Sequence, residues 1–392
     1  MKRSISRGRA AGATALAALM TATLLLAQAV AKPPAPGLER TGIAPPAAAR
    51  IEAAFVLDTT GSMSGLIDGA KRKIWSIANQ MASARQQTGL RLALIGYRDR
   101  GDAYVTRRFD LSSDVDQIYA ELQQFSADGG GDGPESVNQA LHEAVSALGW
   151  STEPNVYRVI FLVGDAPPHL DYPDDVSFEE SVRLARRKGI AINTIQCGGL
   201  AETTPIWQRI AALGGGEYAA IAQDGGMLAL ATPLDDELAQ LNGELAGTVL
   251  SYGDARSRAE LERKLDNARA APAAAAADRL AYLGKAGGAV VSGRKDLVDA
   301  VKGGLALESV AKDELPPAMR PMSEPERRAF VERKQKERER LQARIGSLSK
   351  ERDAWLAKEE ARLRAEGRAD GFDQKVFGAI KRQAAAQGID YE

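Results

Sequence analysis

The stretch that decides the fold is Phe55–Ser64, which reads FVLDTTGSMS. Its first residues continue an apolar run that begins at Ala53, and a short apolar run of this kind predicts a buried strand. The run ends at Asp58. After the polar turn, apolar residues recur at helical spacing from Leu66 to Ala78. The sequence therefore predicts a strand, a polar turn and an amphipathic helix in direct succession.

The turn carries three side-chain oxygens at alternate positions, on Asp58, Thr60 and Ser62. In open α/β sheets, ligands bind at the carboxyl ends of the strands. A turn at that edge would direct the three oxygens toward one point. Carboxylate and hydroxyl oxygens suit a hard cation such as Mg²⁺, which prefers a partly hydrated shell of oxygen ligands. The turn is thus a candidate metal site.

Strands and helices alternate from this unit to about residue 247. We expect strands at 52–57, 91–97, 103–109, 156–163, 191–196 and 217–221, and helices at 64–85, 115–125, 135–148, 178–188, 205–213 and 228–245. The short polar turn at 98–102 suggests a hairpin, so the strand at 103–109 is expected to be an antiparallel edge strand. The alternation as a whole predicts an α/β fold with a doubly wound, mostly parallel sheet covered by helices on both faces.

Two further polar loops fall at strand ends or at the start of an adjoining helix. Residues 129–135 read GGGDGPE, and residues 163–169 read VGDAPPH, with Asp165 at the end of an apolar strand. Pro134 and Glu135 also suit the first turn of a helix, so this loop has a purely structural interpretation as well. Because a doubly wound sheet brings nonconsecutive loops together at its switch point, the three loops are expected to converge on one ion.

The pattern Asp58-x-Thr60-x-Ser62 between a strand and a helix resembles the signature of the von Willebrand factor A domain family, over residues 51–247. The resemblance implies a metal-ion-dependent adhesion site. In that site Thr60 and Ser62 contact Mg²⁺ (or Mn²⁺ or Ca²⁺) directly, while Asp58 and Asp165 hold coordinated waters. A carboxylate from an Asp or Glu of a partner protein completes the shell.

In this family the second loop commonly donates a Thr to the metal, and the present sequence departs from that pattern. Counting back from Ala140 places Glu135 at the Thr position, with Asp132 as the alternative ligand. A carboxylate at this position would add negative charge. It would strengthen cation binding and weaken the attraction for an acidic partner.

Three other features invite functional interpretations that the sequence does not support further. Cys197 is the single cysteine, which excludes an intrachain disulfide, and its place at a strand end predicts a small buried side chain. His169 follows Asp165 in a Pro-rich loop, where a structural role or a place on the rim is expected more often than catalysis. The tripeptide Arg100–Asp102 is of a type that some adhesion receptors recognise, but it falls in the predicted hairpin.

The first residues have the pattern of a secretory signal peptide at 1–31. A basic segment precedes an Ala/Leu-rich apolar run, and small residues near Ala29 supply a cleavage site before the Pro-rich linker at 32–50. An uncleaved membrane anchor is the alternative, because the run approaches the length that spans a bilayer. We expect cleavage, no transmembrane segment afterwards, and a periplasmic or secreted protein.

The composition is that of a soluble protein of two or three domains. The chain has 392 residues, a formal net charge of −1, 26% charged and 44% hydrophobic residues. A charge so close to zero gives no electrostatic case for nucleic-acid binding.

Beyond the first domain the composition changes. Residues 248–322 read as a helical, partly low-complexity linker region, and residues 323–392 as a charged helical C-terminal region with a long helix from 323 to about 366. Leu341, Ile345, Leu348 and Trp355 give this helix a narrow apolar stripe, which Arg352 interrupts, so a coiled coil has only weak support and no oligomeric state follows. A small apolar set is expected to pack onto the long helix: Phe372, Val376, Phe377 and Ile380.

Three functional hypotheses follow. The first is a non-enzymatic, metal-dependent protein-binding module of the adhesion type. The second is a hydrolase that uses the same ion as a Lewis acid, although the sequence offers no P-loop and no recognisable nucleophile and base. The third is a structural scaffold of the same fold that has lost its dependence on metal.

Overall fold

The computed structural model describes residues 49–84, 89–131, 133–226, 230–291, 293, 295–367 and 371–391. Residues Pro46–Glu392 cluster into one compact unit. The predicted signal peptide and most of the predicted linker lie outside the described residues and remain predictions. Among the helices that are described, none combines the length and the apolar character needed to cross a membrane.

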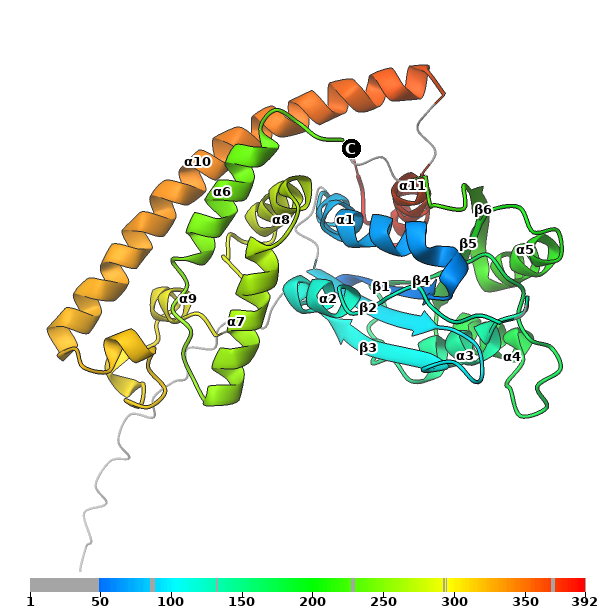
Figure 1. Cartoon of the computed structure of the whole chain (residues 1–392), viewed down its shortest axis with the longest axis horizontal. Helices are drawn as coiled ribbons and strands as arrows, with labels where there is room; N and C mark the ends of the chain where they lie inside the picture. The colour runs from blue at the N-terminus through cyan, green and yellow to red at the C-terminus, as the bar shows by residue number, and fades with distance from the viewer. Residues whose placement is uncertain are drawn as a thin grey trace, which may run out of the picture. The chain divides into compact units, whose positions relative to one another are not determined.

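Six strands form one sheet in the order β3-β2-β1-β4-β5-β6 (Figure 1). All neighbouring strands are parallel except β2 and β3, which confirms the mostly parallel sheet with one antiparallel edge strand. The strands are β1 (Ala49–Asp58), β2 (Gly89–Tyr97), β3 (Thr106–Ser112), β4 (Tyr157–Gly164), β5 (Ile190–Cys197) and β6 (Gly215–Ile221).

The strand β3 begins three residues later than the sequence predicts. The reason lies in the turn before it, where the carboxylate of Asp102 accepts hydrogen bonds from the backbone N–H groups of Asp99 and Gly130. These bonds hold the chain in a loop until Thr106. Asp102, the last residue of the tripeptide Arg100–Asp102, therefore has a structural role in this turn.

Helices cover both faces of the sheet, as predicted. The alternation along β1 separates two cores: Phe55 and Leu57 pack on one side, and Ala54 and Val56 on the other. The first face is covered by α1 (Ser64–Met81), α2 (Val115–Leu122) and α11 (Phe372–Ala385), and the second by α3 (Val137–Ser146), α4 (Phe178–Arg187) and α5 (Thr203–Gly214).

The remaining helices follow β6 in the chain. They are α6 (Asp235–Ala246), α7 (Ala255–Arg269), α8 (Ala273–Lys285), α9 (Leu297–Lys302) and α10 (Glu324–Ala365), with short 3₁₀ helices η1 (Gly61–Met63), η2 (Leu307–Ser309) and η3 (Pro317–Met319). The helix predicted at 228–245 begins at Asp235. Before it, the N–H and the hydroxyl of Thr232 both donate to the Asp235 carboxylate, and this local turn precedes the helix.

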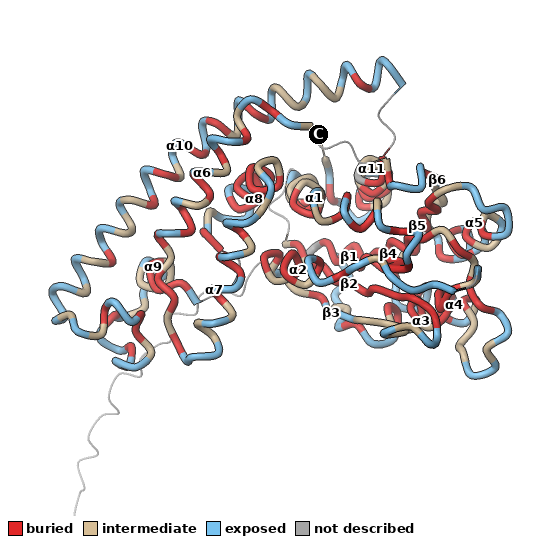
Figure 2. Tube along the Cα trace, in the orientation of Figure 1, coloured by how far each residue is buried: buried red, intermediate tan, exposed pale blue. Residues whose placement is uncertain are grey.

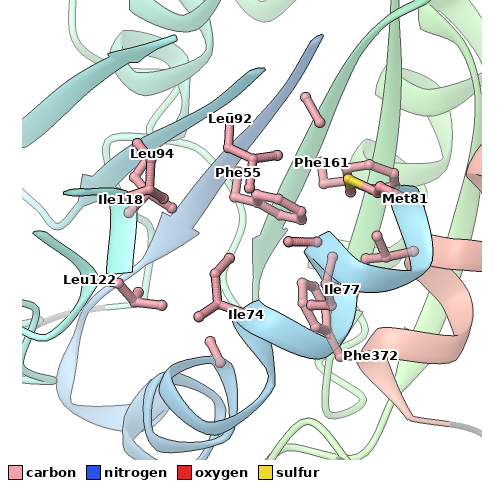
Figure 3. Packing of buried hydrophobic residues seen from close by; sticks show 14 of the residues in the cluster. Phe55, Ile74, Ile77, Met81, Leu92, Leu94, Ile118, Leu122, Phe161 and Phe372 are labelled. Atoms are coloured by element: carbon pink, nitrogen blue, oxygen red, sulfur yellow. The ribbon is translucent and has the colours of Figure 1, made fainter. Parts of the chain in front are cut away.

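The C-terminal helix α11 contradicts one prediction. Its apolar residues do not pack onto the long helix, because Phe372, Val376 and Ile380 lie in the core cluster of the sheet. Figure 3 shows Phe372 in this cluster. The rings of Phe55 and Phe372 are 6.2 Å apart between centroids. Phe377 packs edge-on against Tyr391. The sheet offers α11 a broad apolar surface, whereas the apolar stripe of α10 already packs against other helices.

The long helix α10 begins with a capping box between Ser323 and Glu326. Its stripe of Leu341, Ile345 and Leu348 packs with residues of α6 and α8. Figure 2 shows buried and exposed positions alternating along α10. Arg352 does not interrupt this buried face. Its guanidinium is buried and donates to the carboxylates of Asp235 and Asp278. These two ion pairs extend the buried face of α10 by another turn.

The alanine-rich segment that reads as low complexity forms the buried helix α8. Ala275, Ala276 and Ala277 are buried, and the helix packs against α1 and α6. From α8, Arg279 donates to Asp116 on α2 over 2.7 Å, with both side chains buried. Of the helices after β6, α7 and α8 therefore pack on α2 and α1 of the sheet unit, whereas α10 packs on α6, α8 and α9.

Candidate metal centre

The first loop lies where β1 ends, as the sequence predicts. Asp58 is fully buried, and its Oδ1 accepts hydrogen bonds from the backbone N–H of Thr60 (2.9 Å) and from the Thr60 hydroxyl (2.6 Å). The Thr60 and Ser62 hydroxyl oxygens are 3.3 Å apart. Since Ser62 is exposed, the three side chains form a series that runs from the core at Asp58 to the surface at Ser62.

The second loop approaches the first through its glycines. The N–H of Gly61 donates to the carbonyl oxygen of Gly129. Gly130 has a φ of +76°, and a Cβ built on it would lie 3.0 Å from both Glu135 Oε1 and Thr60 Cβ. Only a residue without a side chain fits between these groups. Glu135 and Thr60 are thus neighbours across a backbone segment that glycine alone allows.

Glu135 lies ahead of the helix in which the sequence placed it. Its N–H donates to the carbonyl oxygen of Pro167, and the N–H of His169 donates to the carbonyl oxygen of Glu135. This short parallel pairing ties the second loop to the third, and α3 consequently begins only at Val137. The alternative ligand Asp132 lies outside the described residues.

The third loop places Asp165 directly after β4. The carbonyl oxygen of Asp165 accepts a hydrogen bond from the Thr203 hydroxyl at the start of α5. Its carboxylate Oδ2 accepts one from the side-chain amide of Gln223, over 2.6 Å. The same amide lies 3.3 Å from the carbonyl oxygen of Ser62, so Asp165 is linked to the first loop.

The three loops line one open pocket of about 320 Å³ at the carboxyl edge of the sheet. Of the six candidate ligands, Thr60, Ser62, Glu135 and Asp165 line it, and Asp58 lies beneath Thr60. The remaining lining residues are Gly61, Gly129, Gly130, Gly133, Ala166, Cys197, Leu200 and Gln223. Residues far apart in the sequence therefore meet at one place, as the doubly wound topology requires.

Two buried acids, Asp58 and Glu135, are destabilised in their charged forms. Burial raises the pKa of Asp58 to about 7, and the nearby charge of Asp165 adds to the shift. Burial also raises the pKa of Glu135 to about 9, reinforced by the charges of Asp58, Asp99, Asp102 and Asp165. One oxygen of each carboxylate, Asp58 Oδ2 and Glu135 Oε2, is buried without a hydrogen-bond partner.

This donor set fits a divalent cation. Buried, unpartnered carboxylate oxygens are costly in a folded protein, and a bound cation would remove both the lack of partners and the mutual repulsion. Within the described residues, no three His, Cys, Asp or Glu side chains could hold a metal ion by themselves. The hydroxyls of Thr60 and Ser62 would therefore have to contribute, which is the hard-oxygen chemistry that Mg²⁺ prefers.

The contacts of His169 and the burial of Cys197 are those of residues with a structural role. The His169 ring stacks on Tyr172, its Nδ1 lies 2.8 Å from Asp171 Oδ1, and its Nε2 lies 3.3 Å from Asp99 Oδ2. Cys197 is buried, and burial raises the pKa of its thiol. A thiol that stays protonated is a poor nucleophile and a poor metal ligand.

Sequence reasoning missed Gln223. It follows β6, the last parallel strand, in the polar stretch Gln223–Gly226. The same rule that selected the first and third loops, polar residues at the carboxyl end of a strand, applies here too. The position of Gln223 after a strand could therefore have indicated it. It was not selected because an amide is not a preferred Mg²⁺ ligand, whereas the other loops offered carboxylates.

Comparison with known proteins gives one family. Residues 52–233 match the model of a von Willebrand factor A domain. No curated protein sequence matches the chain significantly.

Two solved structures illustrate the similarity. Proximal thread matrix protein 1 from the mussel byssus, described with a zinc-occupied MIDAS motif, is 18% identical with a TM-score of 0.36, covering 45% of this chain and 42% of that chain. An aerotolerance-related membrane protein from Bacteroides fragilis NCTC 9343 is 15% identical with a TM-score of 0.31, covering 44% of this chain and 92% of that chain. This chain therefore spans less than half of the mussel protein.

Proposed function

We propose that this chain, which contains a von Willebrand factor A domain at residues 52–233, is a metal-ion-dependent protein-binding module. The pocket at the carboxyl edge of the sheet would hold Mg²⁺, with Mn²⁺ or Ca²⁺ as substitutes. A partner protein would contribute the carboxylate of an Asp or Glu.

The observation that carries the proposal is the pair of unpartnered oxygens on Asp58 and Glu135. Each belongs to a carboxylate that is almost completely buried, and each carboxylate has a raised pKa. A fold that needed these acids only as caps would give both oxygens N–H or O–H partners. A cation site would instead leave them free for the ion or for the water molecules bound to it.

The roles of the individual residues follow their depth in the pocket. The hydroxyls of Thr60 and Ser62 and the carboxylate of Glu135 would hold the cation directly. Asp58 lies behind Thr60 and accepts its hydroxyl proton, so it orients a ligand oxygen toward the pocket. Asp58 and Asp165 would act on the cation through bound water. All of these groups belong to the pocket loops, so the side of the cation that faces the solvent would stay open for a partner.

The open side of the pocket is where a partner would bind. A bound divalent cation supplies a positive centre that attracts a carboxylate oxygen from outside. Besides the candidate ligands, the pocket is lined by four glycines, Ala166, Cys197, Leu200 and Gln223. Most of these residues are small and Leu200 is exposed, so a partner's side chain can enter from the open side. Glu135 adds a negative charge that lowers this attraction, and affinity for a single acidic side chain should be modest.

Binding is favoured over hydrolysis by the chemistry of the pocket lining. Among the described residues that line the pocket, the titratable ones are Glu135, Asp165 and Cys197. The two acids are assigned to the cation, and the thiol is buried with a raised pKa. With both acids assigned to the cation, no described lining side chain remains as general base or nucleophile, and hydrolysis would rest on a cation-bound water alone.

We also propose that the protein acts after export, in the periplasm or outside the cell. The support is the signal-peptide pattern at 1–31. The net charge of −1 gives no support for a nucleic-acid partner.

A pull-down from envelope extract tests this function. The full chain should capture a partner in Mg²⁺ and lose it in EDTA, and Asp58→Ala should capture none in either condition. Asp68→Ala is the matched control, because Asp68 is an exposed acid on α1 ten positions further along. Equal recovery by the wild type and Asp58→Ala would contradict the proposal.

A further inference from the structure

A fourth loop reaches the pocket from the far strand of the sheet. Residues 222–226 follow β6 and turn back through a hydrogen bond from the N–H of Gly225 to the carbonyl oxygen of Ala222. Asp224 packs against Gly65 at the start of α1, where a Cβ on Gly65 would lie 2.9 Å from Asp224 Cβ. The loop is therefore seated directly beside the first metal-site loop.

The same loop is fixed from behind by the C-terminal helix. The N–H of Phe372, the first residue of α11, donates to the carbonyl oxygen of Gly225 over 3.0 Å. The Phe372 side chain is buried in the core of the sheet. Although the loop lies at the surface, this hydrogen bond connects its backbone to a residue of the core. The position of the loop's backbone, from which its side chains extend, is therefore fixed.

That side chain is Gln223. Its amide Nε2 donates to Asp165 Oδ2 over 2.6 Å and lies 3.3 Å from the carbonyl oxygen of Ser62. Its Oε1 lies over Gly198, where a Cβ would come within 2.1 Å of it. The absence of a side chain at Gly198 leaves the space that the Gln223 amide occupies.

We propose that Gln223 is a positioning residue of the cation site. This inference rests on the proposed function. By donating to one oxygen of Asp165, the amide fixes the plane of that carboxylate and leaves its second oxygen for the cation or its water. By lying against Ser62, it holds the first loop at a fixed distance from the third. An amide suits this task because it donates hydrogen bonds without adding a charge that would repel a cation.

Hydrogen-bond partners of metal ligands commonly change metal affinity by 10- to 100-fold when they are removed. Replacing Gln223 should therefore weaken cation binding by about tenfold or more. Packing should change little, because Gln223 is exposed as a residue. The effect should depend on the N–H donor and not on the volume of the side chain.

The test is a Mn²⁺ titration of the full chain and of Gln223→Ala and Gln223→Met, with affinity read by calorimetry. Met keeps the length of the side chain and lacks the donor. Both variants should bind Mn²⁺ about tenfold more weakly or worse, with melting temperatures in EDTA equal to the wild type. The matched control is Gln240→Ala, since Gln240 is an exposed glutamine on α6 whose side chain bonds to Glu244. Wild-type affinity in Gln223→Met would overturn the inference.

The EPR spectrum of bound Mn²⁺ gives a second readout that a purely structural role would not change. At saturating Mn²⁺, the spectrum of Gln223→Met should differ from that of the wild type, because the ligand set is less well ordered. Identical spectra would overturn the inference. Failure of the proposed function itself would look different, since Asp58→Asn would then bind Mn²⁺ as tightly as the wild type.

Discussion

The hydroxyl of Thr60 donates to Oδ1 of Asp58 over 2.6 Å, while Oδ2 of the same carboxylate is buried without a partner. The bond fixes the direction of the Thr60 oxygen. Burial nevertheless raises the pKa of the Asp58 carboxyl to about 7, against the opposing effects of its hydrogen bonds with Thr60 and with the backbone of Asp165. Asp58 therefore orients the hydroxyl of Thr60, a candidate ligand. Its buried carboxylate would also be stabilised by a nearby positive charge. The predictions below depend on this relationship and on the packing that maintains it.

Asp58→Asn should stabilise the fold at pH 8 in EDTA. Asn keeps an acceptor for Thr60 and removes a carboxylate whose pKa burial has raised to about 7. The gain in the free energy of unfolding should be on the order of 1–3 kcal/mol at pH 8 and should shrink toward pH 5. Urea unfolding at the two pH values measures it, with Asp68→Asn as the control. A destabilised Asp58→Asn at pH 8 would contradict this interpretation.

Metal-free stability should fall as the pH rises, and a cation should reverse the fall. The folded pKa values of Asp58 and Glu135, about 7 and about 9, lie above their ordinary values of 3.8 and 4.5. The stability these groups contribute is complete below about pH 4 and is lost as the pH rises through 7 and 9. A cation binds the deprotonated acids, so Mg²⁺ should raise the melting temperature more at pH 8 than at pH 5.5. Equal shifts at the two pH values would argue against a site built on these acids.

Glu135→Gln should weaken cation binding by at least about tenfold, since the loss of a mere hydrogen-bond partner of a ligand commonly costs that much. The change removes a charge and keeps the size of the side chain, so the backbone pairing of Glu135 with the third loop should survive. Mn²⁺ calorimetry measures the loss. Glu153→Gln is the control, because Glu153 is exposed. If Glu135→Gln bound Mn²⁺ as the wild type does, Glu135 would not be a ligand.

Arg352→Ala should destabilise the fold by about 3–5 kcal/mol, since it leaves the buried carboxylates of Asp235 and Asp278 without their cation. Arg344→Ala, which removes an exposed ion pair with Glu237, should cost less than about 1 kcal/mol. Chemical denaturation compares the two. Similar losses would show that the buried pairs do not hold α10 in place.

Phe372→Ala should cost about 3–5 kcal/mol of stability, because it empties part of the core next to Phe55. Phe377→Ala, on the half-buried side of α11, should cost less. Thermal unfolding followed by circular dichroism measures both. Equal, small effects would mean that α11 contributes little to the sheet core.

The sheet and the first and third loops of the pocket could be predicted from local patterns. The apolar run before Asp58 and the one before Asp165 each end in a polar turn, and a parallel sheet places both turns at one edge. Glu135, predicted as a metal ligand, lines the pocket but lies ahead of the helix in which the sequence placed it, and its role as a ligand stays a prediction. Its pairing with Pro167 lies between two loops, and no local periodicity indicates such a pairing.

The contacts that the sequence did not indicate join residues far apart in the chain. Phe372 packs against Phe55, and Arg352 joins Asp235 and Asp278. Helical spacing showed that α11 has an apolar face, but hydrophobic burial has no direction and does not specify which surface receives that face. Arg352 looked like a break in an apolar stripe because its two partners lie on other helices.

The measurement that tests the central claim most directly is a calorimetric titration of the full chain with Mg²⁺ at pH 8, beside Asp58→Asn. We predict one binding event for the wild type and none for Asp58→Asn, whose fold should remain intact by circular dichroism. Equal binding by the two proteins, or no binding by either, would contradict the claim that the pocket at the end of β1 holds a divalent cation.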